Sequence, residues 1–179
     1  MIQHVRTSIP RRQRGAVLGI VLVLVIVVTV LGLSSLRGTL MQERMAGNMY
    51  DRSLGFQAAE AALREAEALL EQASIREAFP ASGDCSNGLC PTPTAGSADR
   101  WTSSTFSGWR NATVNVGSLA GAAPQFIIEY MNQAPNWPGC DRMTPVHERC
   151  LSGRYRITAR SAAGSERAQI ILQSTVSTP

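Results

Sequence analysis

The fold of this chain is decided near its N-terminus by residues 14–36, RGAVLGIVLVLVIVVTVLGLSSL. The part from Ala16 to Leu36 contains no charged side chain. At about 1.5 Å rise per residue, such a helix reaches roughly 30 Å, about the thickness of the hydrocarbon core of a bilayer. The segment from Met1 to Gly15 carries four arginines and no acidic residue. Because positive charge is retained in the cytoplasm, we expect a single membrane helix with its N-terminus inside and the remainder of the chain exported.

The junction Arg14-Gly15-Ala16 places a small residue between a basic leader and the apolar run. A secretory signal peptide is cut after its apolar stretch, whereas this arrangement favours cutting before it. The apolar helix would then stay in the mature protein as its N-terminus. The sequence therefore predicts a basic leader (1–15), a transmembrane and assembly helix (16–36), an amphipathic continuation of that helix (37–79), and a loop-rich periplasmic part with an antiparallel sheet (80–179).

The charge of the chain argues against a nucleic-acid partner. The formal net charge is +4, from 17 basic and 13 acidic residues, and the leader alone holds four of the arginines. The chain after the leader is therefore close to neutral and offers no basic stripe of the kind that follows a phosphate backbone. We expect no binding to nucleic acid.

The four cysteines form two close pairs in the sequence, Cys85 with Cys90 and Cys140 with Cys150, all after the membrane helix. An oxidising compartment favours disulfides, and each local bridge would stabilise a small domain by roughly 2–3 kcal/mol. A zinc site with His147 as a further ligand is the alternative, although structural zinc sites usually use the tighter Cys-x2-Cys spacing. We expect two local disulfides and no metal or other cofactor, although four cysteines allow three pairings.

Helical periodicity continues beyond the membrane segment. Apolar residues recur at spacings of three and four and line one face of a helix: Phe56, Ala59, Leu63, Ala66, Leu70 and Ala73. We therefore expect one nearly continuous helix from Ala16 to about Glu77. Its glycines favour melting or bending between Gly38 and Asn48, because each costs about 1 kcal/mol relative to alanine in a helix.

After the helix, the sequence predicts a long irregular connection and then a small antiparallel sheet. Residues 80–123 are rich in Gly, Pro, Ser and Thr, with weak strand signal at 113–116. Three later segments have strand character, 126–130, 154–161 and 168–175, and a Gly-Ser pair at 164–165 favours a hairpin turn between the last two. Three antiparallel strands over the apolar face of a helix make an α+β fold.

Enzyme signatures are missing from the sequence: it contains no Gly-rich phosphate loop, no Gly-x-Ser-x-Gly and no His-Glu-x-x-His. We therefore expect no catalytic activity. Three acidic residues, Glu65, Glu67 and Glu71, are interpreted as a solvated helix face. The tryptophans, Trp101, Trp109 and Trp137, lie in loop-like sequence, where they either pack as a satellite of the core or form exposed contacts for a partner.

Several of these segments together resemble the type IV pilins, and more closely the minor pilins of the PilX type. The resemblance rests on the leader ending Gln13-Arg14-Gly15, the apolar run from Ala16, and the stretches 42–48 (QERMAGN), 56–63 (FQAAEAAL) and 155–159 (YRITA). It implies the pilin fold, cleavage after Gly15 by a prepilin peptidase, and N-methylation of Ala16. It also implies insertion in the inner membrane of a Gram-negative envelope, followed by assembly with other minor pilins and the major pilin into an extracellular pilus used for adhesion and twitching motility.

The chain departs from the common pilin pattern at two positions. Ala16 stands where major pilins generally begin with Phe, and Ile20 stands at the fifth mature position, where most pilins carry Glu. In a filament that carboxylate neutralises the amino terminus of a neighbouring subunit, because an unpaired buried charge is very costly. A subunit without it is tolerated at the tip, where one neighbour is absent, and the tip-capping pseudopilins of type II secretion share the omission. The alternative is that the loss of Glu is neutral in a low-copy subunit.

Three functions are therefore compared: a minor pilin that helps to initiate pilus assembly at or near the tip, a pseudopilin of a type II secretion system, and a signal-anchored periplasmic domain with another function.

Overall fold

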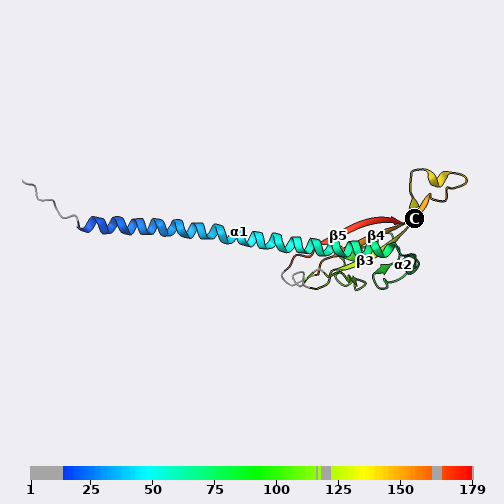
Figure 1. The fold of residues 1–179 in the computed structure, drawn as a ribbon, viewed down its shortest axis with the longest axis horizontal. Helices are drawn as coiled ribbons and strands as arrows, with labels where there is room; N and C mark the ends of the chain where they lie inside the picture. Colours follow the sequence, from blue (N-terminus) through cyan, green and yellow to red (C-terminus); the bar gives the residue numbers. More distant parts are fainter. Residues whose placement is uncertain (1–13, 116, 118–121, 163–166, 179) are drawn as a thin grey trace, which may run out of the picture. The chain divides into compact units, whose positions relative to one another are not determined.

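The computed structural model describes residues 14–115, 117, 122–162 and 167–178 (Figure 1). The chain divides into two units, Met1–Gly47 and Asn48–Pro179. The elements in chain order are α1 (Arg14–Leu70), α2 (Ala73–Glu77), β1 (Leu89–Cys90), the 3-10 helix η1 (Arg100–Thr102), β2 (Arg110–Asn111), β3 (Gln125–Pro135), the 3-10 helix η3 (Cys140–Arg142), β4 (Leu151–Arg160) and β5 (Ile171–Thr178).

Helix α1 is continuous through the glycines that were expected to interrupt it. Residues from Gly38 to Asn48 are all α-helical, so the predicted melting of this segment is wrong. Side chains described between Gly15 and Tyr50 are exposed, and burial begins at Asp51. The helical hydrogen bonds of the backbone therefore outweigh the cost of the individual glycines, about 1 kcal/mol each.

Helical structure extends to Glu77, as predicted, but it is interrupted, because α1 ends at Leu70 and α2 begins at Ala73. Gln72 has an extended backbone, with φ −80° and ψ 122°, and α2 starts after it. The guanidinium of Arg76 folds back and donates to the carbonyl oxygens of Leu70 and Glu71 at 2.7 and 2.9 Å. Those carbonyls belong to the last residue of α1 and to the residue after it, where no further helical turn supplies a donor, so Arg76 stabilises the break.

The sheet contains the three antiparallel strands that the sequence predicted, together with two short strands in the predicted connection. Its order is β1-β3-β4-β5, with β2 also paired to β3. The β3–β4 and β4–β5 pairs are antiparallel, whereas β1 runs parallel to β3. The strand predicted at 113–116 is wrong for 113–115, which are irregular, and β2 lies just before them. Residue 116 and the predicted turn at 164–165 lie outside the described residues.

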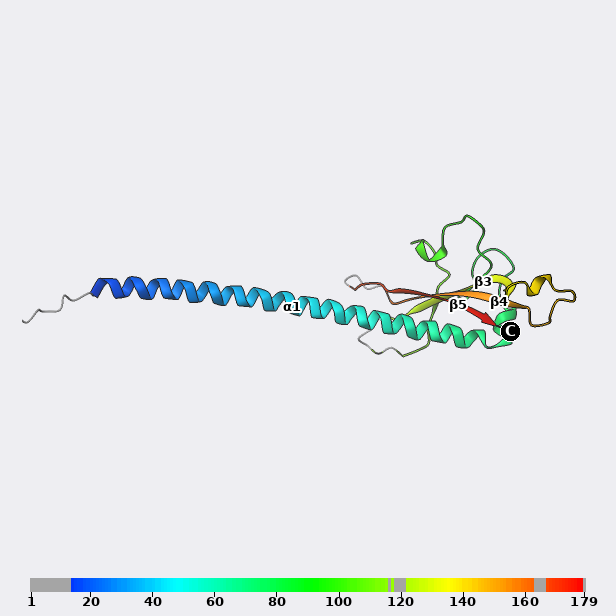
Figure 2. The ribbon, with the colours of Figure 1, turned by 90° about the horizontal axis from the view of Figure 1, so that it is seen from above.

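The C-terminal part of α1 packs on one face of the sheet, and the connection after α2 covers the other face (Figure 2). Ala59, Leu63, Ala66 and Leu70 are buried as predicted. Phe56 is half exposed, and Ala73 is exposed because it follows the break in the helix. The core between α1 and the sheet consists of Ala62, Leu63, Ala66, Leu70, Leu89, Ala112, Phe126, Ile128, Tyr155, Ile157 and Ala159.

Candidate functional site

The N-terminal part of α1 is an apolar helix that has no partner in the described structure. Among the described residues, one helix is long and apolar enough to cross a membrane, and it spans Gly15–Leu70. The exposed fraction of Ile20 is 61%, in line with its large apolar neighbours. Thr29 donates its hydroxyl to the carbonyl oxygen of Ile26 at 2.8 Å, so this polar group is satisfied inside the helix. Such a surface is suited to lipid or to other apolar helices.

The two residues of the expected processing junction lie at the start of this helix. Gly15 and Ala16 are both within α1, and a Cβ atom built on Gly15 would meet no other heavy atom within 4 Å. Nothing inside the described chain therefore requires glycine at this position. Ile20 lies on the same helix and brings an aliphatic side chain to the position where the resemblance to pilins led us to expect a carboxylate.

Alanines let α1 approach the sheet closely. Ala59, Ala62 and Ala66 are 0% exposed, and Ala58 is nearly so. With small side chains at these positions, the larger groups of the sheet, such as Phe126, fill the interface. Within the C-terminal unit, the last part of α1 is thus held to the sheet by ordinary core packing.

Glu65 ties the segment after β2 to α1, so its interpretation as a solvated residue was wrong. Its carboxylate accepts from the backbone N–H of Thr113 at 2.8 and 3.0 Å and from that of Val114 at 3.1 Å. Glu67 is half-buried and accepts from the hydroxyl of Ser174 at 3.2 Å. Two of the three acidic residues on this part of the helix therefore have structural partners.

A buried carboxylate organises the face of the sheet that is turned away from α1. Glu129 in β3 has no exposed side-chain surface, and its two oxygens accept from Arg100 at 2.6 Å and from Arg156 at 2.8 Å. Arg156 also contacts Asp99 at 3.2 Å. Burial lowers the pKa of Arg156, but the hydrogen bond and charge of Glu129, with the charge of Asp99, raise it above its ordinary value overall. The connection that carries Asp99 and Arg100 is thereby joined to β3 and β4.

Sequence reasoning missed this cluster. The signal that was present is the charged residue within the apolar run Phe126-Ile127-Ile128-Glu129-Tyr130, since a carboxylate in a strand that is buried on both faces needs a charged partner. The partners come from η1, 29 positions away, and from β4, 27 positions away. No local pattern in the sequence pairs residues at such separations.

Two of the three tryptophans are half-buried, and one of them, Trp109, packs against an arginine of β4. The guanidinium of Arg160 lies 3.9 Å from the centroid of the Trp109 ring, and Phe106 meets that ring edge-on at 5.9 Å. Burial lowers the pKa of Arg160. Trp101 and Trp109 are half-buried, and their indole N–H groups have no hydrogen-bond partner in the described structure. These two residues therefore fit the packing alternative for the loop tryptophans.

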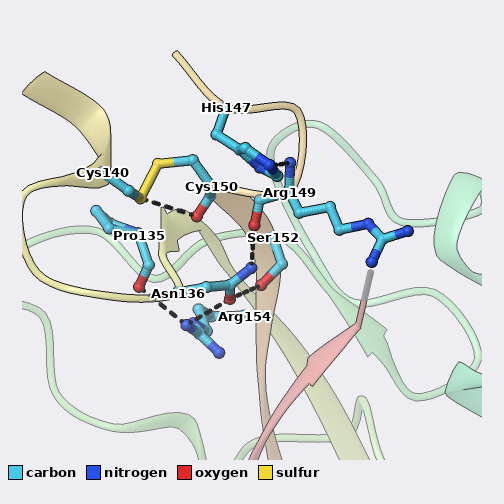
Figure 3. The surroundings of a disulfide bond; sticks show 8 residues. All are labelled: Pro135, Asn136, Cys140, His147, Arg149, Cys150, Ser152 and Arg154. Carbon is cyan, nitrogen blue, oxygen red and sulfur yellow. Dashed lines mark hydrogen bonds between the residues drawn. A yellow bond between two sulfur atoms is a disulfide. The ribbon is translucent and has the colours of Figure 1, made fainter. Parts of the chain in front are cut away.

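The disulfide between Cys140 and Cys150 closes a loop at the junction of β3 and β4, and residues 141–149 are all exposed (Figure 3). At the base of this loop, the Asn136 side chain donates to the carbonyl oxygen of Arg149 at 2.8 Å and accepts from Ser152 at 2.7 Å. The exposed loop carries Met143 and Val146, with exposed fractions of 51% and 49%. These bonds hold a loop with apolar side chains away from the core.

His147 takes a local role in this loop. Its Nδ1 accepts from the backbone N–H of Arg149 at 3.1 Å, and its ring meets that of Trp137 at 5.6 Å. The second disulfide joins Cys85 to Cys90, next to β1. All four sulfurs are thus engaged in the two local bridges that the sequence favoured over zinc. Trp137 is exposed, so among the tryptophans it alone retains the partner-contact alternative.

Two family models match the chain. The model described as PilX N-terminal matches residues 14–64, and the model described as Type IV pilus assembly protein PilX C-term matches residues 80–178. The first match contains the apolar helix and most of the amphipathic part of α1, and the second contains the whole sheet and both disulfides. Neither the comparison with curated proteins nor the comparison with solved structures found a significant match.

Proposed function

The chain belongs to the PilX family of type IV pilus assembly proteins, and on that premise we propose that this minor pilin helps to initiate pilus assembly and sits at or near the pilus tip. The observation that carries the proposal is Ile20. A subunit in the shaft that lacks the glutamate leaves the amino terminus of a neighbour unpaired among apolar helices. Such an uncompensated charge costs several kcal/mol even after relaxation, on the order of 3–5 kcal/mol. At the end of the filament the neighbour is absent, and so is the cost.

The proposal includes a path from the membrane to the pilus. A prepilin peptidase cuts between Gly15 and Ala16, and Ala16 becomes the N-methylated first residue. Until assembly, the apolar part of α1 spans the inner membrane once, with the leader in the cytoplasm. During assembly, the same apolar surface leaves lipid for the helices of other minor pilins and of the major pilin, which replaces one apolar environment by another.

Adhesion and twitching motility are part of the same proposal. The loop closed by Cys140 and Cys150 presents apolar side chains to solvent, and exposed apolar groups of this kind are frequent at contacts with other molecules. Loss of the protein would remove the pilus, and twitching motility with it, if it acts at initiation. The family matches favour the pilus over the type II secretion system as its place of work.

The test is to locate the protein on filaments and then to restore the missing carboxylate. Antibody against the exposed loop 140–150 is expected to label wild-type pili at one end. Ile20→Glu is expected to move label into the shaft, because each copy can now pair with a neighbouring amino terminus. Val21→Glu is the matched control, since it adds the same charge one position away from the pilin glutamate, and it is expected to reduce incorporation. Even labelling along wild-type filaments would refute the tip position.

A further inference from the structure

Strand β5 forms an unprotected edge of the sheet. It pairs with β4 on one side, and the described residues place no strand on its other side. Its sequence, ILQSTVST, contains no charged residue, proline or glycine, and its eight pairs with β4 follow one another without a bulge. Proteins usually protect an edge of this length with charges, proline, a bulge or a covering element, because its free backbone groups invite another strand. On the far side of the sheet, β1 has only two residues, and β3 has an irregularity between Tyr130 and Gln133.

The direction of the free backbone groups follows from the residue that precedes β5. Ile170 donates its N–H to the hydroxyl of Ser161 and accepts at its carbonyl from the N–H of Ser161, both at 2.9 Å, so both groups point toward β4. Successive residues of an antiparallel strand point alternately toward and away from the partner strand. With the unbroken register of β5, the residues that direct both backbone groups to the open edge are Ile171, Gln173, Thr175 and Ser177.

Two grooves lie between this edge and α1. The groove near the start of β5 has a volume of about 650 Å³ and is lined on the α1 side by Met49, Arg52, Ser53 and Phe56. The exposed fractions of Met49 and Phe56 are 71% and 51%. The groove near its end has a volume of about 730 Å³ and is lined by Glu67 of α1, by Glu71 just after the end of α1, by Arg76 and by residues 174–178. Helix α1 therefore leaves the edge open and offers apolar side chains at one end and carboxylates at the other.

The carboxylates in the second groove have no cationic partner. Glu67 accepts only from Ser174, Glu71 is exposed, and neither forms an ion pair among the described residues. Arg76 lies in the same groove with its Nη1 on the backbone carbonyls of Leu70 and Glu71, so its charge offsets one of the two carboxylates and the other remains uncompensated. This end of the groove is thus complementary to a positively charged side chain.

We propose that the open edge of β5 is a strand-addition site for an extended segment of a partner protein. That segment has arginine or lysine where it passes Glu67 and Glu71, and an apolar side chain where it passes Met49 and Phe56. Main-chain hydrogen bonds along β5 supply affinity, and the two grooves supply selectivity. A second copy of this chain fits less well, because its own β5 carries no charge to place opposite the carboxylates. The proposal does not depend on the tip position and concerns a surface other than the apolar helix.

The test uses the purified full chain in detergent micelles and fluorescence-labelled peptides of eight residues that alternate valine and threonine. Two probes carry leucine at one end and arginine at the other, in both orientations, so that parallel and antiparallel addition are covered. Saturable binding is expected, as an increase in anisotropy, for one of them. Replacement of arginine by glutamate, or N-methylation of alternate backbone amides, is expected to weaken binding about tenfold or more, since each removes charge-assisted or main-chain hydrogen bonds.

Variants of the chain locate the site. Thr175→Pro removes a backbone N–H that points to the open edge, without removing a hydrogen bond to β4, and is expected to abolish peptide binding. The control Thr175→Val keeps this N–H and should bind the peptide as the wild type does. If Thr175→Pro does not fold, Glu71→Lys decides, because it is expected to shift preference from the arginine peptide to the glutamate peptide. Three results would overturn the proposal: the N-methylated peptide binds as tightly as the unmodified one, neither the charge of the peptide nor Glu71→Lys changes the affinity, or no saturable binding is found up to about 1 mM. Spontaneous disulfide-linked dimers of Thr175→Cys would instead identify a second copy as the occupant and would overturn it too.

Discussion

Replacement of Arg156 by methionine is expected to lower the stability of the C-terminal unit markedly. Glu129 is completely buried, and Arg156 is its hydrogen-bond partner at one oxygen, at 2.8 Å, while Arg100 holds the other oxygen. Breaking a buried pair by removing one member costs roughly 3–5 kcal/mol. Because the Arg156 side chain is 19% exposed and Arg100 remains, we expect about 2–3 kcal/mol. At roughly 3–5 °C per kcal/mol for a domain of this size, Tm falls by roughly 6–15 °C.

The assay is thermal unfolding of the full chain in detergent, followed by tryptophan fluorescence. Trp109 is a suitable reporter because its ring stacks on Arg160, on the same face as Glu129. Arg64→Met is the matched control: it removes an i,i+4 pair with Glu60 in which the Arg64 side chain is 75% exposed, and such pairs contribute well under about 1 kcal/mol. A change of Tm in Arg156→Met no larger than in this control would refute the reasoning.

A combined replacement separates the burial of charge from simple loss of packing. Glu129→Leu together with Arg100→Met and Arg156→Met removes the buried carboxylate and both of its arginine partners and leaves only the partly exposed Asp99. This triple variant should recover most of the stability that Arg156→Met alone loses, because apolar groups of similar volume often replace a buried ion pair at little cost. If the triple variant is instead less stable than Arg156→Met, the charge explanation is wrong.

The pH dependence of this effect follows from the raised pKa of Arg156. The contribution of Arg156 to stability is fully present below the pKa of the unfolded chain and is lost only above the raised pKa of the folded protein. The Tm difference between wild type and Arg156→Met is therefore expected to stay constant from about pH 6 to 9.

Three further perturbations test other parts of the chain. Gly15→Leu is expected to leave uncut precursor in the inner membrane, because a bulky residue at the cleavage junction blocks access to a membrane-embedded peptidase. The precursor would appear as a slower band on immunoblots, and mature protein of normal size would contradict the prepilin assignment. Cys140→Ser opens a loop whose ends are 10 positions apart and is expected to cost about 2–3 kcal/mol in urea unfolding, whereas reducing agent should have no further effect at this bridge. Glu65→Gln weakens the acceptor for the backbone N–H groups of Thr113 and Val114, so we expect faster limited proteolysis near Thr113 while Tm stays within about 2 °C of the wild-type value. A rate of proteolysis equal to that of the wild type would argue against a role of Glu65 in holding this segment.

The sequence predicted the elements of the fold better than their limits. The apolar helix and three long strands were recognised because helical and strand periodicities are local properties of the chain. The end of α1 at Leu70 was missed, because it depends on Arg76 folding back onto carbonyl groups five and six positions earlier. The short strands β1 and β2 were missed as well, because two residues show no periodicity and become strands only by pairing with β3.

The family resemblance, the apolar helix, the proposed processing junction and Ile20 at the fifth proposed mature position could all be read from the linear order of residues, because each is a property of a contiguous segment. Only the tertiary structure brought Glu129 between Arg100 and Arg156, and only it left the edge of β5 open beside Glu67 and Glu71. The physical reason is that a buried charge and an unpaired strand edge are defined by what surrounds them. Their partners, or the space where a partner would lie, come from segments far apart in the chain.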